Sequence, residues 1–144
     1  MKIKIVFIAI TVLLFLFIIF KTQKIVSTFS INNLTKDQIK DELIISFFFT
    51  DTKNTVQDYY SDYLSSPVAV YDYEMVIVDL SKTNNIITIK LGVTPQIGAH
   101  NPVGYDEIIF QVDNYGKKEL MSFEHIKSYS LPDRFNSDII APLP

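Results

Sequence analysis

Four segments between residues 70 and 127 alternate apolar and polar side chains with a period of two. The first two are VYDYEMVIV and IITIKLGV, and the next two are YDEIIFQV and ELMSFEHI. Alternation of this kind is typical of strands with one buried face, and the intervening SKTNN and DNYGK segments consist largely of turn residues. The sequence therefore predicts a four-stranded antiparallel β-meander.

Helical patterns precede the strands. In LTKDQIKDELIISFFF the apolar residues Ile39, Leu43 and Phe47 recur every four positions, and Thr35 opens a T-x-x-Q capping box. TDTKNT interrupts this pattern, and VQDYYSDYL resumes it, which predicts a helix, a break and a shorter helix. We therefore expect an α+β domain over residues 35–127, with one or two helices packed on the meander.

The register is predicted by keeping the apolar side chains on one face, because a shift of one residue would turn a whole strand over. Pairing Leu91 with Ile108 and Ile108 with Phe123 meets this condition and places Asp106 opposite His125. The other predicted pairs are Leu80 with Ile86, Ile77 with Ile89, Met75 with Leu91, Tyr73 with Val93, and Phe110 with Met121.

This register brings five candidate ligand-binding residues to one end of the helix-covered face. Tyr73, Asp106 and His125 lie at the strand ends, and the loop QIGAHNPVG adds His100 and Asn101. An imidazole can act as a general base or bind a metal, and two histidines with carboxylates suit an open zinc site. The structural alternatives are that His100 belongs to a turn and that Asp106 and His125 form a cross-strand charge pair. The residues identify neither a metal nor a cofactor.

Several kinds of chemistry find no support in the sequence. The chain has no Cys, so it has neither a disulfide framework nor a thiolate nucleophile. It has no G-x-S-x-G motif, no P-loop and no dinucleotide fingerprint. Tyr59, Tyr60 and Tyr63 could form a binding platform, but their helical spacing favours a stripe in the core.

Residues 5–20, IVFIAITVLLFLFIIF, contain Thr11 as their single polar residue. Sixteen helical residues span about 24 Å, slightly less than a hydrocarbon core of about 30 Å, and the flanking lysines can snorkel to the interface. We therefore predict that residues 1–24 form an uncleaved signal-anchor that contacts the membrane through residues 5–20. The alternative is a signal peptide whose cleavage leaves a secreted protein.

The remainder of the chain is acidic. Four of the 13 Lys and Arg residues precede residue 25, which leaves 9 against 16 Asp and Glu and a balance of −7 over residues 25–144. This charge is not typical of nucleic-acid binders, and together with the basic N-terminus it favours a C-terminal domain outside the cell membrane. We expect residues 25–34 to be a linker and the Pro-containing residues 128–144 to be an extended tail.

The segments IGAHNPVGYDEIIFQV and GKKELMSFEHIK resemble an uncharacterised domain-of-unknown-function family of small exported proteins from Gram-positive spore-forming bacteria. In that family a G-A-H-N-P-P-type loop precedes a strand that ends in Phe. The likeness covers roughly Asp37 to Lys127, and this chain has Val103 in place of the second proline. The resemblance implies export and a compact α+β domain, and it supplies no activity, substrate or cofactor.

These observations favour a non-enzymatic interaction or accessory module at the cell envelope, with an unknown protein partner. The alternative is a small-ligand or metal-binding domain, hydrolytic or not, that uses the GAHNP loop with His125 and Asp106. A shared site would require the two imidazoles to lie close together, whereas an interaction module would not.

Overall fold

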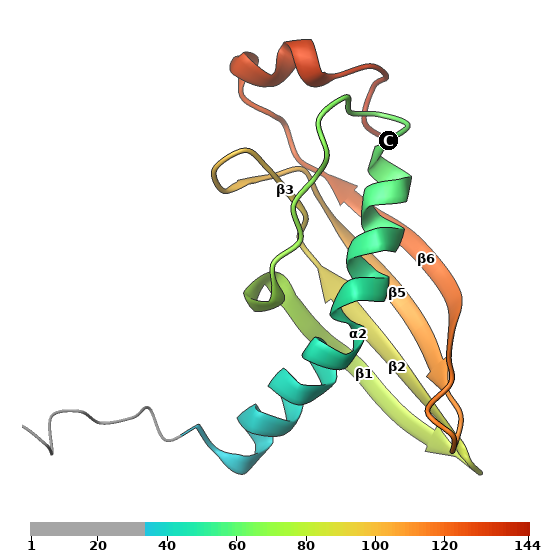
Figure 1. The fold of residues 1–144 in the computed structure, drawn as a ribbon. Coiled ribbons are helices and arrows are strands. Elements are labelled where there is room, and N and C mark those ends of the chain that lie inside the picture. The colour runs from blue at the N-terminus through green and yellow to red at the C-terminus, as the bar shows by residue number, and fades with distance from the viewer. Residues whose placement is uncertain (1–33) are drawn as a thin grey trace, which may run out of the picture. The chain divides into compact units, whose positions relative to one another are not determined.

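The computed structural model describes residues 34–144, which form an α+β domain. Helix α2 (Lys36–Tyr60) packs on one face of a four-stranded antiparallel sheet in the order β1-β2-β5-β6 (Figure 1). The strands are β1 (Met75–Thr83), β2 (Ile86–Val93), β5 (Gly104–Val112) and β6 (Lys118–Ser128). The short elements are the 3-10 helices η1 (Asp72–Glu74) and η2 (Asp133–Asp138) and the two-residue strands β3 (Gln96–Ile97) and β4 (Asn101–Pro102).

The predicted membrane anchor, residues 1–24, and nearly all of the predicted linker lie outside the described residues. Within residues 34–144, no helix combines the length and the apolar character needed to cross a membrane. The anchor therefore stays a prediction from the sequence.

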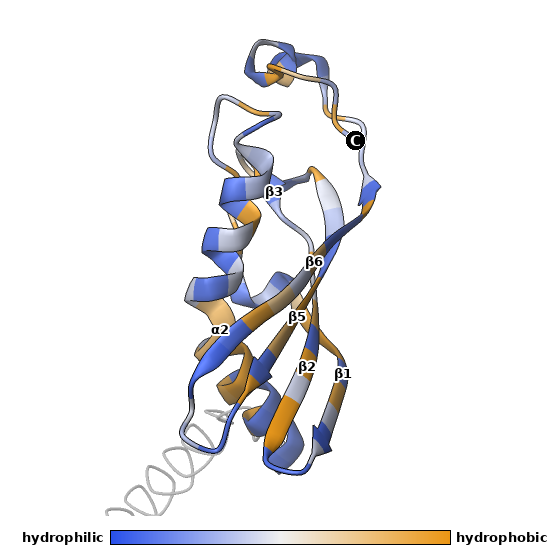
Figure 2. Ribbon diagram, turned by 90° about the vertical axis from the view of Figure 1, so that its right-hand side faces the viewer, coloured by the Kyte–Doolittle hydropathy of each residue, from blue (hydrophilic) through white to orange (hydrophobic). Residues whose placement is uncertain are grey.

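One continuous helix replaces the predicted helix, break and shorter helix. The predicted stripe is also wrong, because Ile39, Leu43 and Phe47 are exposed, Leu43 to 70%. The buried face is displaced by one position from the predicted stripe and continues through the TDTKNT segment, where Thr52 is buried. The amphipathic pattern is therefore not interrupted, and the helix continues through this segment. Figure 2 shows that the hydrophobic residues of α2 are concentrated in its middle, between a mainly hydrophilic start and a mainly hydrophilic C-terminal half. The buried side chains of α2 are Phe48, Thr52, Val56 and Tyr60.

The predicted register is confirmed for the inner part of the sheet and for the end that holds the candidate site. The confirmed pairs are Leu91 with Ile108, Ile108 with Phe123, and Asp106 with His125. One pair on these strands is wrong: Phe110 lies opposite Leu120, because the β5–β6 register shifts beside it.

The predicted register between β1 and β2 is wrong. Met75 lies opposite Val93, two residues from its predicted partner, and beyond a bulge at Val78, Leu80 lies opposite Ile89, three residues from its predicted partner. The strands continue to a two-residue turn that starts at Asn84, whose φ of 56° is in the left-handed region that Asn tolerates. A register shift of two residues leaves Met75 on the buried face. The alternation of apolar and polar residues therefore could not distinguish the two registers. The overturned pairs are Leu80 with Ile86, Ile77 with Ile89, Met75 with Leu91, and Tyr73 with Val93.

The C-terminal segment, expected to be extended, contains η2 and returns to the end of α2. Ile140 donates its N–H to the Tyr63 carbonyl over 2.9 Å, and Leu64 forms a β-bridge with Ile139. Apolar side chains of this segment pack against the core, which accounts for its ordered path. These side chains are Leu131, Phe135 and Leu143.

Candidate functional site

Asp106 and His125 are at the centre of a polar network at the upper end of the sheet. Nδ1 of His125 lies 2.7 Å from Oδ1 of Asp106, and the Tyr60 hydroxyl donates to the same oxygen over 3.3 Å. On the other side of the imidazole, Nε2 lies 2.9 Å from Oγ of Ser128. The Ser128 hydroxyl donates in turn to the main-chain oxygen of Pro144 over 2.5 Å. The network thus joins α2, β5, β6 and the C-terminal segment.

A bulge in β6 explains the contact between His125 and Ser128. In a regular strand, residues three positions apart face opposite sides of the sheet. Here the register passes from His125 to Lys127 over consecutive residues of β5, which leaves Ile126 as an extra residue. One extra residue reverses the alternation, so Ser128 returns to the face that carries His125.

The Asp106 carboxyl is fully buried, and the side chain of His125 is 11% exposed. Burial raises the pKa of Asp106, and the hydrogen bonds from His125 and Tyr60 offset only part of this effect. Oδ2 of Asp106 has no hydrogen-bond partner among the described residues. The contacts at Oδ1 are therefore the main compensation for burying this carboxyl.

Two tyrosines and a glycine hold the imidazole in place. The Tyr59 ring stacks on that of His125 at 5.6 Å between centroids, and the Tyr60 ring meets it edge-on at 6.1 Å. Burial raises the pKa of Tyr59 to about 12 and also raises that of Tyr60, so both hydroxyls stay neutral near pH 7. At Gly104, a Cβ would lie 2.9 Å from Cε1 of His125, which leaves no room for a side chain.

The loop that carries His100 is a tight turn between β3 and β4. Asn101 closes it by donating to the carbonyl of Ala99 over 2.9 Å, and Arg134 donates to Oδ1 of Asn101 over 2.9 Å. Gly98 and His100 both adopt left-handed backbone, with φ of 57° and 59°. Asn101, rather than His100, therefore provides the side-chain hydrogen bonds that hold the turn.

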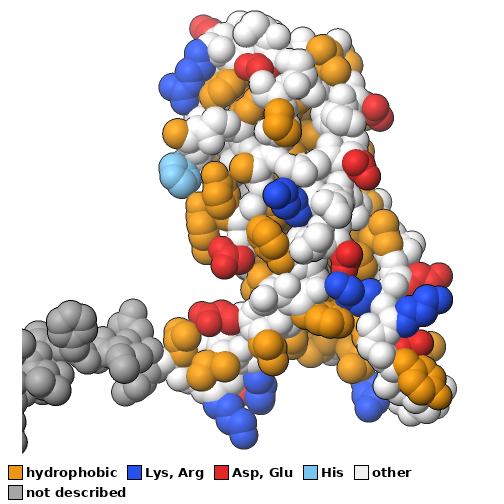
Figure 3. All heavy atoms as spheres, in the orientation of Figure 1, with side chains coloured by type: hydrophobic (Ala, Val, Ile, Leu, Met, Phe, Trp, Pro, Cys, Tyr) orange, Lys and Arg blue, Asp and Glu red, His pale blue; other side chains and the backbone are white. Residues whose placement is uncertain are grey.

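His100 is exposed and belongs to a row of aromatic rings. It packs on Tyr71 at 6.1 Å between centroids, and Tyr71 stacks on Tyr73 at 5.1 Å with 16° between the planes. Figure 3 shows a histidine at the surface beside hydrophobic side chains. No hydrogen bond or ring contact within residues 34–144 joins this row to Asp106 or His125. The five candidates are thus divided into a buried pair and a surface group.

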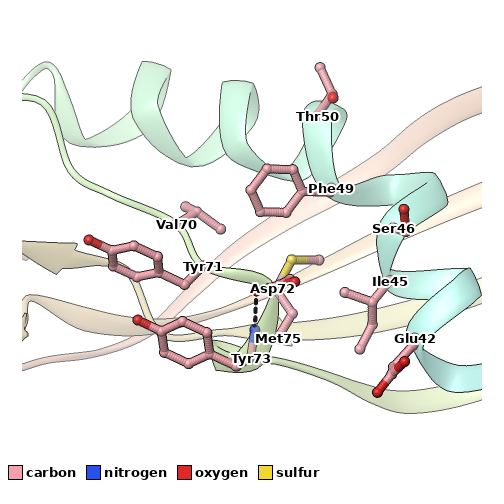
Figure 4. Close-up of a pocket in the computed structure, with 10 residues that line it drawn as sticks. All are labelled: Glu42, Ile45, Ser46, Phe49, Thr50, Val70, Tyr71, Asp72, Tyr73 and Met75. Atoms are coloured by element: carbon pink, nitrogen blue, oxygen red, sulfur yellow. Dashed lines mark hydrogen bonds between the residues drawn. The ribbon is translucent and has the colours of Figure 1, made fainter. Parts of the chain in front are cut away.

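The aromatic row borders a groove of about 820 Å³ between α2 and residues 70–75 (Figure 4). Figure 4 shows the Phe49 ring projecting from α2 toward this segment, with Tyr71 and Tyr73 at one end and Glu42 at the other. Asp72 lies between them, and none of the ten described lining residues is Lys or Arg. The floor is apolar and consists of Ile45, Phe49, Val70 and Met75.

A second groove, of about 690 Å³, lies between the N-terminal half of α2 and the hairpin end of the sheet. Its lining is apolar apart from Ser81 and Lys82. Beside it, Lys118 of β6 donates to the main-chain oxygen of Phe47 over 2.9 Å, lies 4.5 Å from the centroid of that ring, and forms an ion pair with Asp51. Lys118 therefore connects the end of the sheet to the first half of α2.

The residues of these sites that were not identified from the sequence include Tyr71, Gly104 and Ser128. Tyr71 could have been noticed, because it alternates with Tyr73 in the sequence. The two tyrosines are not in a strand, however, since η1 begins directly after Tyr71. Ser128 could be found only by knowing of the bulge at Ile126. No group of three or more His, Asp or Glu side chains in the described part of the chain is placed to hold a metal ion.

Comparison with known families finds one match, described as "Protein of unknown function (DUF3888)", over residues 40–127. This span includes α2 from its second turn, the complete four-stranded sheet apart from the last residue of β6, and both Asp106 and His125. No curated protein and no solved structure matches the chain.

Proposed function

The chain belongs to the DUF3888 family of proteins of unknown function, and we propose that it is an interaction module that binds a positively charged, partly aliphatic segment of a partner protein. The proposed binding site is the groove between α2 and residues 70–75. The observation that carries the proposal is the combination of an apolar floor, two stacked tyrosines and two carboxylates in a groove whose lining within residues 34–144 contains neither Lys nor Arg.

Each part of the groove suits one part of such a ligand. The apolar floor favours aliphatic side chains, because covering it removes apolar surface from water. Lys or Arg side chains are attracted to tyrosine rings and to carboxylates, and Tyr73, at 62% exposure, is accessible to them. The balance of −7 over residues 25–144 adds long-range attraction for a basic partner.

We further propose that the module acts at the outer side of the cell membrane, anchored by residues 5–20. The support is the apolar run and its flanking lysines. Fractionation of cells expressing the full chain tests the anchor, and added protease tests the side on which residues 34–144 lie. Recovery of the full chain in the cytosolic fraction would contradict this location.

Peptide titration followed by NMR tests the groove. The probes are two peptides that differ only in charge, acetyl-Leu-Lys-Leu-Lys-Leu-amide and acetyl-Leu-Glu-Leu-Glu-Leu-amide. We expect the lysine peptide to shift the amide signals of residues 42–50 and 70–75, and the glutamate peptide to bind at least tenfold more weakly. Added salt should weaken the lysine peptide's binding, because exposed charges are screened.

Three variants locate the site. Tyr73→Ala removes an exposed ring and Glu42→Gln removes a charge, and each should weaken binding of the lysine peptide several-fold while the fold is kept. Tyr115→Ala, which removes a tyrosine that is 89% exposed in the β5–β6 turn, is the matched control and should bind as wild type does. Equal binding of both peptides, or shifts outside the groove, would rule out this function.

A further inference from the structure

We propose that Ser128, His125 and Asp106 form a nucleophilic relay that takes up an acyl group from a carboxylic ester. This inference concerns the polar network at the upper end of the sheet and does not depend on the groove beside α2. The family description assigns no activity to these residues.

The geometry has the parts that an activated serine needs. Asp106 is a buried carboxyl 2.7 Å from Nδ1 of His125, which leaves Nε2 facing the Ser128 hydroxyl at 2.9 Å. A carboxyl that orients an imidazole, with the imidazole within hydrogen-bond reach of a hydroxyl, is the arrangement that makes serine nucleophilic. Tyr59 and Tyr60 restrict the ring on two sides, so this orientation is built into the core.

Ser128 also lines a pocket. The pocket has a volume of about 300 Å³, and its apolar wall comes from the C-terminal segment. Its size and lining suit a short aliphatic acyl group beside Ser128. The apolar lining residues are Leu131, Ile139, Pro142 and Leu143.

The C-terminal segment holds the serine in a resting arrangement. The Ser128 hydroxyl has one proton, and it is donated to the main-chain oxygen of Pro144. When Pro144 moves away, the hydroxyl can rotate and donate to Nε2 of His125 instead. An ester that enters the pocket must therefore displace Pro144 before it reacts.

The reaction then proceeds without any further reactant except water. Oγ of Ser128 forms a bond to the ester carbonyl carbon while its proton passes to Nε2 of His125. The bond from that carbon to the leaving alcohol breaks, and His125 returns the proton to the departing oxygen. Water repeats the sequence on the acyl-serine, releasing the carboxylic acid and restoring the hydroxyl. Asp106 is a positioning residue that stays hydrogen-bonded to Nδ1 throughout.

Reaction with para-nitrophenyl butyrate tests the relay, with the site of modification read by mass spectrometry of peptides. We expect butyrylation of Ser128 in the wild-type chain, and its loss in Ser128→Ala with a fall in para-nitrophenol release of roughly hundredfold. Ser122→Ala, which removes an exposed hydroxyl elsewhere on β6, should react as wild type does. Release that is equal in wild type and Ser128→Ala would overturn the proposal.

A thiol at this position gives a second readout that does not need an ester. Because the chain has no Cys, Ser128→Cys and Ser130→Cys each introduce a single thiol. If His125 activates position 128, Ser128→Cys should react with iodoacetamide about tenfold faster than Ser130→Cys, and adding His125→Ala should remove the difference. A network that only ties the C-terminal segment to the sheet would leave position 128 the slower of the two, and that result would also overturn the proposal.

Discussion

Asp106 and His125 lie directly opposite each other on β5 and β6, with 2.7 Å between Oδ1 and Nδ1 on the buried face of the sheet. The neighbouring pair, Lys90 and Glu107, forms its ion pair on the opposite face, where both side chains keep part of their exposure. Because those two side chains keep part of their exposure, water still solvates part of each charge. Water cannot replace either partner of the buried pair of Asp106 and His125. The protonation of Asp106 is therefore coupled to folding.

The first prediction concerns pH. Because folding raises the pKa of Asp106, the folded chain holds this proton more tightly than the unfolded chain does. The contribution of Asp106 to the free energy of unfolding is therefore fully present below the ordinary Asp pKa of about 3.9 and is lost as pH rises through the raised value. The Asp106→Asn variant has no carboxyl to titrate at this position, so its free energy of unfolding should not fall in this way as pH rises.

Urea unfolding at a series of pH values measures the effect. As pH rises from about 4, wild type should lose unfolding free energy relative to Asp106→Asn. Two curves that stay parallel over the whole range would show that Asp106 has the same proton affinity in the folded and unfolded chains.

The second prediction concerns Gly104. A Cβ there would lie 2.7 Å from the main-chain oxygen of Lys127 and 2.9 Å from Cε1 of His125, and it would also meet the Tyr60 hydroxyl. Gly104→Ala should lower the free energy of unfolding by about 1–3 kcal/mol, as overpacking does, and displace the His125 ring signals in NMR spectra. Gly116→Ala is the control, since a Cβ there meets nothing and costs only about 1 kcal/mol through its φ of 81°. A loss in Gly104→Ala no larger than in Gly116→Ala, with the His125 ring signals unmoved, would contradict the packing argument.

The third prediction concerns a buried hydroxyl in α2. Thr52 is fully buried, and its Oγ1 has no hydrogen-bond partner among the described residues. Thr52→Val replaces this hydroxyl by a methyl group of similar size and should raise the free energy of unfolding by about 1 kcal/mol. Thr55→Val should instead have no benefit, because Oγ1 of Thr55 donates to the Asp51 carbonyl over 2.9 Å. Thermal melting of the two variants decides this, and a lower melting temperature for Thr52→Val would show that the hydroxyl is satisfied.

The fourth prediction concerns the link between the sheet and the first half of α2. Removing Lys118 abolishes its hydrogen bond to Phe47, its contact with that ring and its ion pair with Asp51. In Lys118→Ala, amide hydrogen exchange in residues 36–47 should accelerate about fivefold, as a loss of about 1 kcal/mol implies. Lys117→Ala is the matched control and should exchange as wild type does. Unchanged exchange in Lys118→Ala would mean that the apolar contacts of Phe48 alone hold this part of the helix.

The sequence by itself determined the fold class, the four strands and the pairing of Asp106 with His125. These features follow from alternation, because a strand with one buried face admits a single parity. Parity does not distinguish registers that differ by two residues, and Met75 therefore pairs with Val93 instead of Leu91. In α2 a repeat of four fits more than one face of the helix, and the buried stripe is Phe48, Thr52, Val56 and Tyr60 and not the predicted Ile39, Leu43 and Phe47.

Only the tertiary structure decided how the candidate residues are grouped. The bulge at Ile126 brings Ser128 to His125, and η1 takes Tyr73 away from β1 into the aromatic row with His100. Both depend on local backbone irregularities that interrupt a period of two, and such irregularities leave no periodic signal in the sequence. The path of the C-terminal segment likewise depends on contacts between Leu64 and Ile139, residues far apart in the chain that only the packed helix and sheet bring together.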